Sequence, residues 1–284
     1  MGYEVKVSSI SNKKILNEGT KLALSETCLP VKFYYGHVLE LAQKKVDYIF
    51  VPRLVSFNKK EYLCPRFMGL PDTIEHNIPD TPPLIVPTIN YNNKETWKNA
   101  ALEVGKQLGV SPVKSYKAYI KGALKERNKA KAKEAELNQV LTNANKKIAL
   151  IGRDYILNDE ITGTSIKEKI KSSGYEIITS NMFNDREVME GNKYIDKKLY
   201  WTLNKRLFGS AMSLVSKGQV DGIVQVIAFG CGPDSIVCEL IERKIKRISS
   251  IPNMTLTLDE HTGEAGMFTR LEAFFDLLER RKTS

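Results

Sequence analysis

The sequence of 284 residues lacks an apolar stretch that approaches the length of a transmembrane helix, and it lacks a leader in which basic residues precede an apolar run. It has only four cysteines, and no two of them form a C-x-x-C pair. These absences exclude an integral membrane protein and a disulfide framework, and they predict a soluble cytoplasmic protein whose thiols are reduced or bound to metal. At this length the chain can form two domains, each with its own hydrophobic core.

The formal net charge is +10, and most of the excess lies in one segment. Residues 111–147 contain ten Lys or Arg against three Asp or Glu. Ser111 and Pro112 predict the start of a helix. Apolar residues follow at helical spacing with lysines beside them, namely Val113, Tyr116, Ile120 and Leu124, and Lys114, Lys117, Lys121 and Lys125. Since no aromatic set for base stacking accompanies this run, we expect no nucleic-acid partner. A solvated helix face and a docking surface for an acidic partner or a phosphate-bearing ligand both remain open.

The second half of the sequence alternates short apolar runs with helical patterns, which is typical of a parallel sheet with right-handed crossovers. We expect strands at 148–152, 175–179, 222–229 and 254–258. We expect helices at 165–172, 197–217, 233–244 and 263–281. The fold class is therefore α/β.

The first half follows the same pattern but begins within a unit. Residues 2–8 resemble residues 174–180, which contain the second strand of the second half, so we expect a strand there and a first domain without its initial strand and helix. Further strands are predicted at 48–51 and 84–87, and helices at 12–24 and 31–44. We expect two Rossmann-like domains, at 1–90 and 147–284, joined by a helical, basic linker at 91–146.

Three cysteines lie beside prolines in predicted loops: Cys28 before Pro30, Cys64 before Pro65, and Cys231 before Pro233. Ligands of parallel α/β sheets bind beyond the carboxyl ends of the strands, and Cys231 directly follows a predicted strand. Gly230 and Gly232 would let the backbone approach a bulky group, and the start of the next helix would favour the thiolate. Cys238 lies two helical turns further on, and we expect a small buried side chain there. The three loop cysteines are candidate metal ligands, although their spacing is not diagnostic.

Several segments, in the same order along the chain, resemble the 2-hydroxyacyl-CoA dehydratase subunit family, and in particular its acyl-CoA dehydratase activase-related branch. They are Cys28-Leu29-Pro30-Val31-Lys32, His37-Val38-Leu39-Glu40-Leu41, Cys64-Pro65, Phe229-Gly230-Cys231-Gly232-Pro233-Asp234-Ser235 and Leu258-Asp259-Glu260-His261-Thr262-Gly263-Glu264-Ala265-Gly266. The resemblance implies that Cys28, Cys64 and Cys231 ligate one [4Fe–4S] cluster between two domains. It also implies that an ATP-hydrolysing iron–sulfur activator protein supplies electrons of low potential.

This resemblance predicts an iron–sulfur protein of the dehydratase type, and, if it is catalytic, a lyase with an acyl-CoA substrate and a second subunit as possible partners. His261 is then a candidate proton donor, with Glu260 beside it. Acidic residues at a helix start also have a structural explanation in the helix dipole. A non-catalytic electron-transfer or accessory module that docks on the activator, and a structural zinc or binding protein, remain as alternatives.

Overall fold

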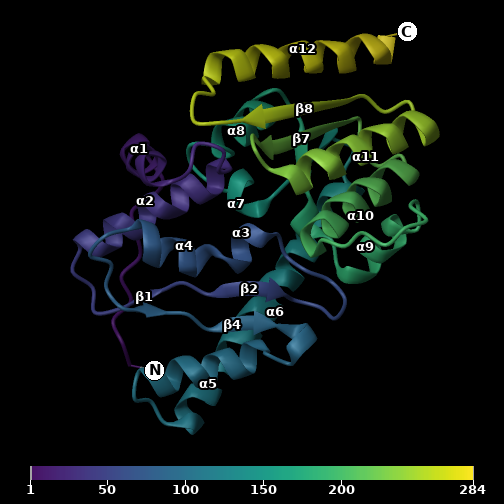
Figure 1. The fold of residues 1–284 in the computed structure, drawn as a ribbon. Helices are drawn as coiled ribbons and strands as arrows, with labels where there is room; N and C mark the ends of the chain where they lie inside the picture. The colour runs from purple at the N-terminus through teal and green to yellow at the C-terminus, as the bar shows by residue number, and fades with distance from the viewer. Residues whose placement is uncertain (1, 284) are drawn as a thin grey trace. The chain divides into compact units, whose positions relative to one another are not determined.

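A computed structural model of the chain describes residues 2–283. Contacts between Cα atoms divide it into two compact units. Unit 1 comprises the described residues up to Thr27, together with Val31–Lys129 and Tyr200–Thr202. Unit 2 comprises Cys28–Pro30, Ala130–Leu199 and the chain from Leu203 onward. Both units are α/β with parallel strand pairing, as the sequence predicts (Figure 1).

Unit 1 is built on two short pairs of parallel strands. Strand β1 (Ile49–Phe50) pairs with β3 (Leu84–Ile85), and β2 (Arg53–Ser56) pairs with β4 (Thr88–Asn90). The helices of the unit are α1 (Lys13–Leu22), α2 (Leu29–Gln43), α3 (Pro65–Met68), α4 (Leu70–Asn77) and α5 (Trp97–Gln107), with the short helix η1 (Tyr91–Asn93). Buried side chains from α2, α4 and the first strand form the core, and because the strands are short this core stays small.

The predicted strand at residues 2–8 is not formed, and this prediction is wrong. Val5 and Val7 are exposed, and none of the described strands pairs with the segment. An alternating pattern becomes a strand only where a neighbouring strand supplies the ladder. Instead, the Ser9 backbone N–H donates to Glu40 at 2.8 Å, and hydrogen bonds from Ser9 and Lys44 outweigh the opposing effect of burial and lower the pKa of Glu40 to about 2.

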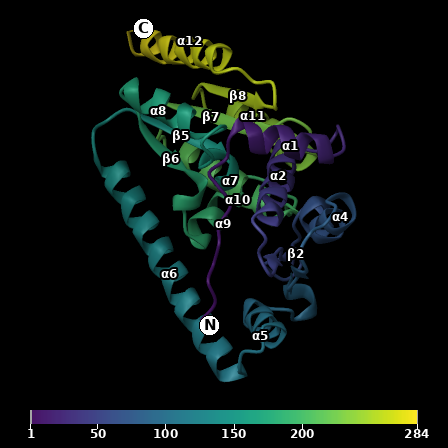
Figure 2. The same ribbon diagram turned by 90° about the vertical axis from the view of Figure 1, so that its left-hand side faces the viewer.

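Helix α6 (Pro112–Thr142) is one continuous helix (Figure 2). Its first turn packs on α5, where Ser115 is fully buried against Gly105. A Cβ atom built on Gly105 would lie 1.8 Å from the Ser115 hydroxyl, so this close approach requires glycine. Residues 120–132 are exposed around the whole circumference of the helix.

Unit 2 contains a four-stranded parallel sheet in the order β6-β5-β7-β8. The strands are β5 (Lys147–Gly152), β6 (Glu176–Thr179), β7 (Gly222–Ala228) and β8 (Asn253–Leu258). Both β5 and β7 are buried along their whole length, which explains why β5 is apolar from Ile148 onward and why β7 is apolar apart from Gln225. The helices are α7 (Asp154–Leu157), α8 (Thr164–Ser172), α9 (Asp185–Asn192), α10 (Thr202–Ser216), α11 (Gly232–Ile248) and α12 (Glu264–Thr283), with the short helix η2 (Ser180–Met182).

The core of unit 2 gathers side chains from the sheet, from the end of α6 and from α10 and α11. Helix α12 packs against α8 on the sheet. These elements match the predicted strands and helices of the second half closely. Among the described residues, no helix is both long and apolar enough to cross a membrane.

Two helical glycines provide a matched test of the α5–α6 contact. We expect Gly105→Ala to lower the free energy of unfolding by about 1–3 kcal/mol, because the added methyl group overpacks the contact with Ser115. Gly122, within α6, has no atom within 4 Å of a Cβ atom built on it. Gly122→Ala should raise the free energy of unfolding by about 0.4–1 kcal/mol. Urea denaturation followed by circular dichroism measures both, and equal effects of the two substitutions would contradict the packing described.

Candidate functional site

The sheet of unit 2 has a topological switch point between the parallel strands β5 and β7. From β5 the chain first adds β6 on one side and then returns to add β7 and β8 on the other. In open parallel sheets, ligands bind beyond the carboxyl ends of the strands at such a switch point. Arg153 directly follows β5, and Cys231 lies three residues after β7. These two strand ends define the candidate site.

An ion pair between Arg153 and Asp234 spans the switch point. The Nε of Arg153 donates to Oδ1 of Asp234 at 2.7 Å, and its Nη2 donates to the same oxygen. The Nη2 also donates to Oδ1 of Asn204, at 2.5 Å. Asn204, in the first turn of α10, also donates from its Nδ2 to the carbonyl of Pro233. The hydrogen bonds therefore join β5, α10 and the start of α11.

Both charged side chains are buried, with 6% of Arg153 and 1% of Asp234 exposed. Burial opposes the charge on the guanidinium, but the Asp234 carboxylate outweighs it and raises the pKa of Arg153, so the arginine stays protonated. The Nη1 of Arg153 and the Oδ2 of Asp234 have no hydrogen-bond partner in the protein. Buried polar atoms of this kind are usually satisfied by ordered water, which can both donate and accept a hydrogen bond.

Cys231 is the N-cap residue of α11 and is partly buried. Gly230 before it has a φ of 76°, a conformation that favours glycine, and a Cβ atom on Gly232 would meet no atom within 4 Å. Burial, and next the charge of Asp234, raise the pKa of the Cys231 thiol to about 12. The backbone N–H of Asp234 at the helix start lowers this pKa, as expected, but desolvation and the neighbouring carboxylate outweigh its effect.

The other cysteines lie in different surroundings. Cys28 directly precedes α2 and groups with unit 2, whereas Cys64 is the N-cap residue of α3 in unit 1. Cys238 is buried in the core of unit 2, as expected for a small apolar side chain. Among residues 2–283, no group of three or more His, Cys, Asp or Glu side chains is arranged to hold a metal ion. The [4Fe–4S] cluster and the ligand roles of Cys28, Cys64 and Cys231 stay predictions.

His261 and Glu260 lie in the turn that follows β8, also at the carboxyl end of the sheet. The His261 side chain is exposed, and its backbone N–H donates to Asp259 Oδ1 at 2.9 Å. The Thr262 hydroxyl donates to the same carboxylate oxygen at 2.8 Å. These bonds give Asp259 a structural role in the turn, and the catalytic roles of His261 and Glu260 stay predictions.

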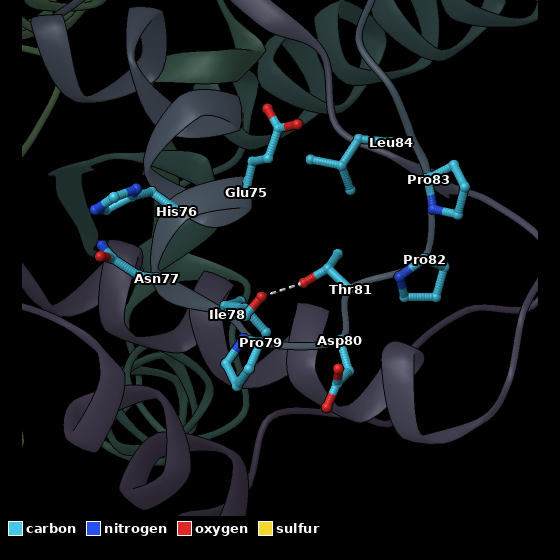
Figure 3. A pocket seen from close by; sticks show the side chains of 10 residues that line it. All are labelled: Glu75, His76, Asn77, Ile78, Pro79, Asp80, Thr81, Pro82, Pro83 and Leu84. Atoms are coloured by element: carbon cyan, nitrogen blue, oxygen red, sulfur yellow. Dashed lines mark hydrogen bonds between the residues drawn. The ribbon is translucent and has the colours of Figure 1, made fainter.

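A separate hollow of about 370 Å³ lies in unit 1 between the end of α4 and β3 (Figure 3). Its lining residues are consecutive, from Glu75 to Leu84, and the Thr81 hydroxyl donates to the carbonyl of Ile78 at 2.7 Å. His76 belongs to this lining. Because one turn of the chain forms the whole hollow, it reflects the path of the loop rather than a site assembled from several elements.

Sequence reasoning missed Arg153, Asn204 and Asp234. Arg153 and Asp234 could have been found. Arg153 directly follows the predicted apolar strand that ends at Gly152, and Asp234 lies in the first turn of the helix after the Cys231 loop. Charges at the ends of neighbouring parallel strands are expected to meet. Asn204 carried no such signal, since its contact depends on how α10 packs.

The state of the Cys231 thiol can be tested by alkylation. With a pKa of about 12, Cys231 should react with iodoacetamide at pH 8 at least about tenfold more slowly than an unperturbed thiol, because only the thiolate reacts. Its rate should keep rising with pH above 9 in the folded protein. Mass spectrometry of the Cys231 peptide follows the reaction, with the urea-unfolded chain as control. Equal rates for folded and unfolded chains at pH 8 would contradict the environment described here.

Comparison with known protein families identifies the family of the chain. Residues 1–183 match the model of the family described as CoA enzyme activase uncharacterised domain (DUF2229), and no curated protein matches the chain. The match covers unit 1 apart from Tyr200–Thr202, together with the start of unit 2, and it ends before Cys231. It overturns the predicted function of a cluster-holding dehydratase subunit, since an activase domain indicates the activator and the described residues form no metal site. Because the match spans more than half of the sequence, the chain belongs to the CoA enzyme activase uncharacterised domain family.

Proposed function

We propose that this chain is an accessory, protein-binding component of a CoA enzyme activator and that it dehydrates no acyl-CoA itself. The observation that carries the proposal is the family match over residues 1–183, which includes nearly all of unit 1. The description of the family supports a CoA enzyme as one partner. As the other partner we propose the ATP-hydrolysing iron–sulfur part of the activator.

The chemistry of the switch point supports a binding role. Arg153 and Asp234 neutralise each other, so the pair carries no net charge that would attract an ion. Arg153 also donates a hydrogen bond to Asn204. The Cys231 thiol, with a pKa of about 12, is a weak nucleophile at neutral pH.

Reconstitution tests this proposal directly. An ATP-hydrolysing iron–sulfur activator and its 2-hydroxyacyl-CoA dehydratase are mixed without oxygen at a limiting activator concentration, and the chain is titrated in. We expect the initial rate of activation to rise in proportion to the bound fraction of the chain. Binding to each partner is measured separately by calorimetry, with serum albumin at equal concentration as control.

Two outcomes would overturn the proposal. In the first, the chain replaces a subunit of the dehydratase and restores turnover of a 2-hydroxyacyl-CoA, which would make it part of the enzyme. In the second, the folded chain binds neither partner and leaves the activation rate unchanged.

A further inference from the structure

The first half of helix α6 presents a row of apolar side chains to solvent. Val113 is 64% exposed, Tyr116 43%, Ile120 39% and Leu124 54%. They follow one another at spacings of three, four and four residues, so they form one narrow stripe along the helix. A stripe of this width is typical of a seam between two packed helices.

The orientation of this stripe is set within unit 1. On the other side of the helix, Ser115 is buried against Gly105 of α5, and Tyr119 is half-buried. The contact with α5 therefore holds α6 so that its apolar stripe points away from the helix on which it packs. The sequence pattern alone would place these apolar residues in the core, and the structure does not.

Positive charge borders the stripe on both edges. Along one edge lie four exposed lysines, Lys114, Lys117, Lys121 and Lys125. At the other edge, Lys98 of α5 lies over the ring of Tyr116, with its Nζ 5.4 Å from the ring centroid. Residues 112–129 contain six Lys or Arg and one Glu. We call the apolar stripe with these five lysines the α6 face.

We infer that the α6 face binds an amphipathic helix of a partner protein whose apolar side chains are bordered by Asp and Glu. Such a helix would cover the four apolar side chains and place its carboxylates against lysines on both edges. The inference depends on the α6 face alone, and it holds whether or not the partner belongs to a CoA enzyme system.

The charge of the face argues against a second copy of the chain. In a two-fold antiparallel pairing, each edge of one helix faces the same edge of its partner, so lysines would meet lysines. In a parallel pairing the two edges face each other, and both are basic. Like charges at such positions are destabilising.

A lipid surface fits the face less well than a helix does. Helices that lie in a membrane interface bury a broad apolar face, rich in Trp, Phe and Leu, to a depth of about 5–10 Å. The α6 face has one apolar residue per turn, with lysines immediately next to it. We therefore commit to a protein helix and treat the membrane as an outcome of the test.

Binding of designed peptides provides the experiment. The probes are two fluorescein-labelled helical peptides that share a Leu seam, one with Glu and one with Lys at the flanking positions. Fluorescence anisotropy with the full chain should show the Glu peptide binding at least about tenfold more tightly than the Lys peptide, with an affinity that falls as salt is raised. A preference of less than twofold, or no binding of the Glu peptide, would overturn the inference.

Two variants locate the binding site on the chain. Ile120→Ala with Leu124→Ala should weaken binding of the Glu peptide about tenfold, because it removes two anchors of the seam. Lys117→Glu with Lys121→Glu should reduce the preference for the Glu peptide to less than about twofold, because two Glu then offset two of the three remaining lysines of the face. Two matched controls should leave binding unchanged. Ile236→Ala with Leu277→Ala removes two exposed aliphatic side chains outside the α6 face. Lys13→Glu with Lys14→Glu makes the same charge change at the start of α1.

Circular dichroism confirms that each variant is folded, which is expected since all substituted side chains are largely exposed. Equal effects of the face variants and of their controls would contradict the assignment. Two further results would also contradict it. One is that the chain sediments with phosphatidylserine vesicles and that Leu124→Ala abolishes this binding. The other is that the chain is a dimer in analytical ultracentrifugation and that Leu124→Ala dissociates it.

Discussion

The buried ion pair between Arg153 and Asp234 joins the ends of the two central strands of the second sheet. Removing two charges from water is costly, and the attraction between them offsets this cost only where further hydrogen bonds satisfy the remaining atoms. Asn204 supplies one such bond and extends the contact to the start of α10. The same carboxylate helps to keep the Cys231 thiol protonated, so the chemistry of the site depends on this pair.

How much the sequence revealed differs between the two halves. In the second half, apolar runs such as Ile148–Gly152 predicted buried parallel strands, because strands that are buried on both faces are mostly apolar. In the first half, residues 2–8 resemble residues 174–180 but have no neighbouring strand, and the strand does not form. The position of Cys231 at a strand end was predictable from topology. Its protonation was not, because it depends on Asp234 and on burial that only the packed structure defines.

Three properties of the chain support the proposed function. Its family is that of an activase domain, the switch point carries a neutralised ion pair and a protonated thiol, and the α6 face presents apolar and basic side chains to solvent. The first property argues for a role in activation, and the other two favour binding over covalent chemistry. An accessory domain that recognises other proteins accounts for all three without requiring the dehydratase role that the cysteine loops suggested.

A double-mutant cycle on Arg153 and Asp234 tests the central claim that this pair holds the site together. Each of Arg153→Met and Asp234→Leu should lower the free energy of unfolding by about 3–5 kcal/mol, because each leaves one buried charge without its partner. The double variant should be more stable than either single variant. The partly exposed pair of Arg53 and Asp72, treated in the same way, should show a coupling of at most about 1 kcal/mol. Additive losses at Arg153 and Asp234, measured by urea denaturation, would contradict the account.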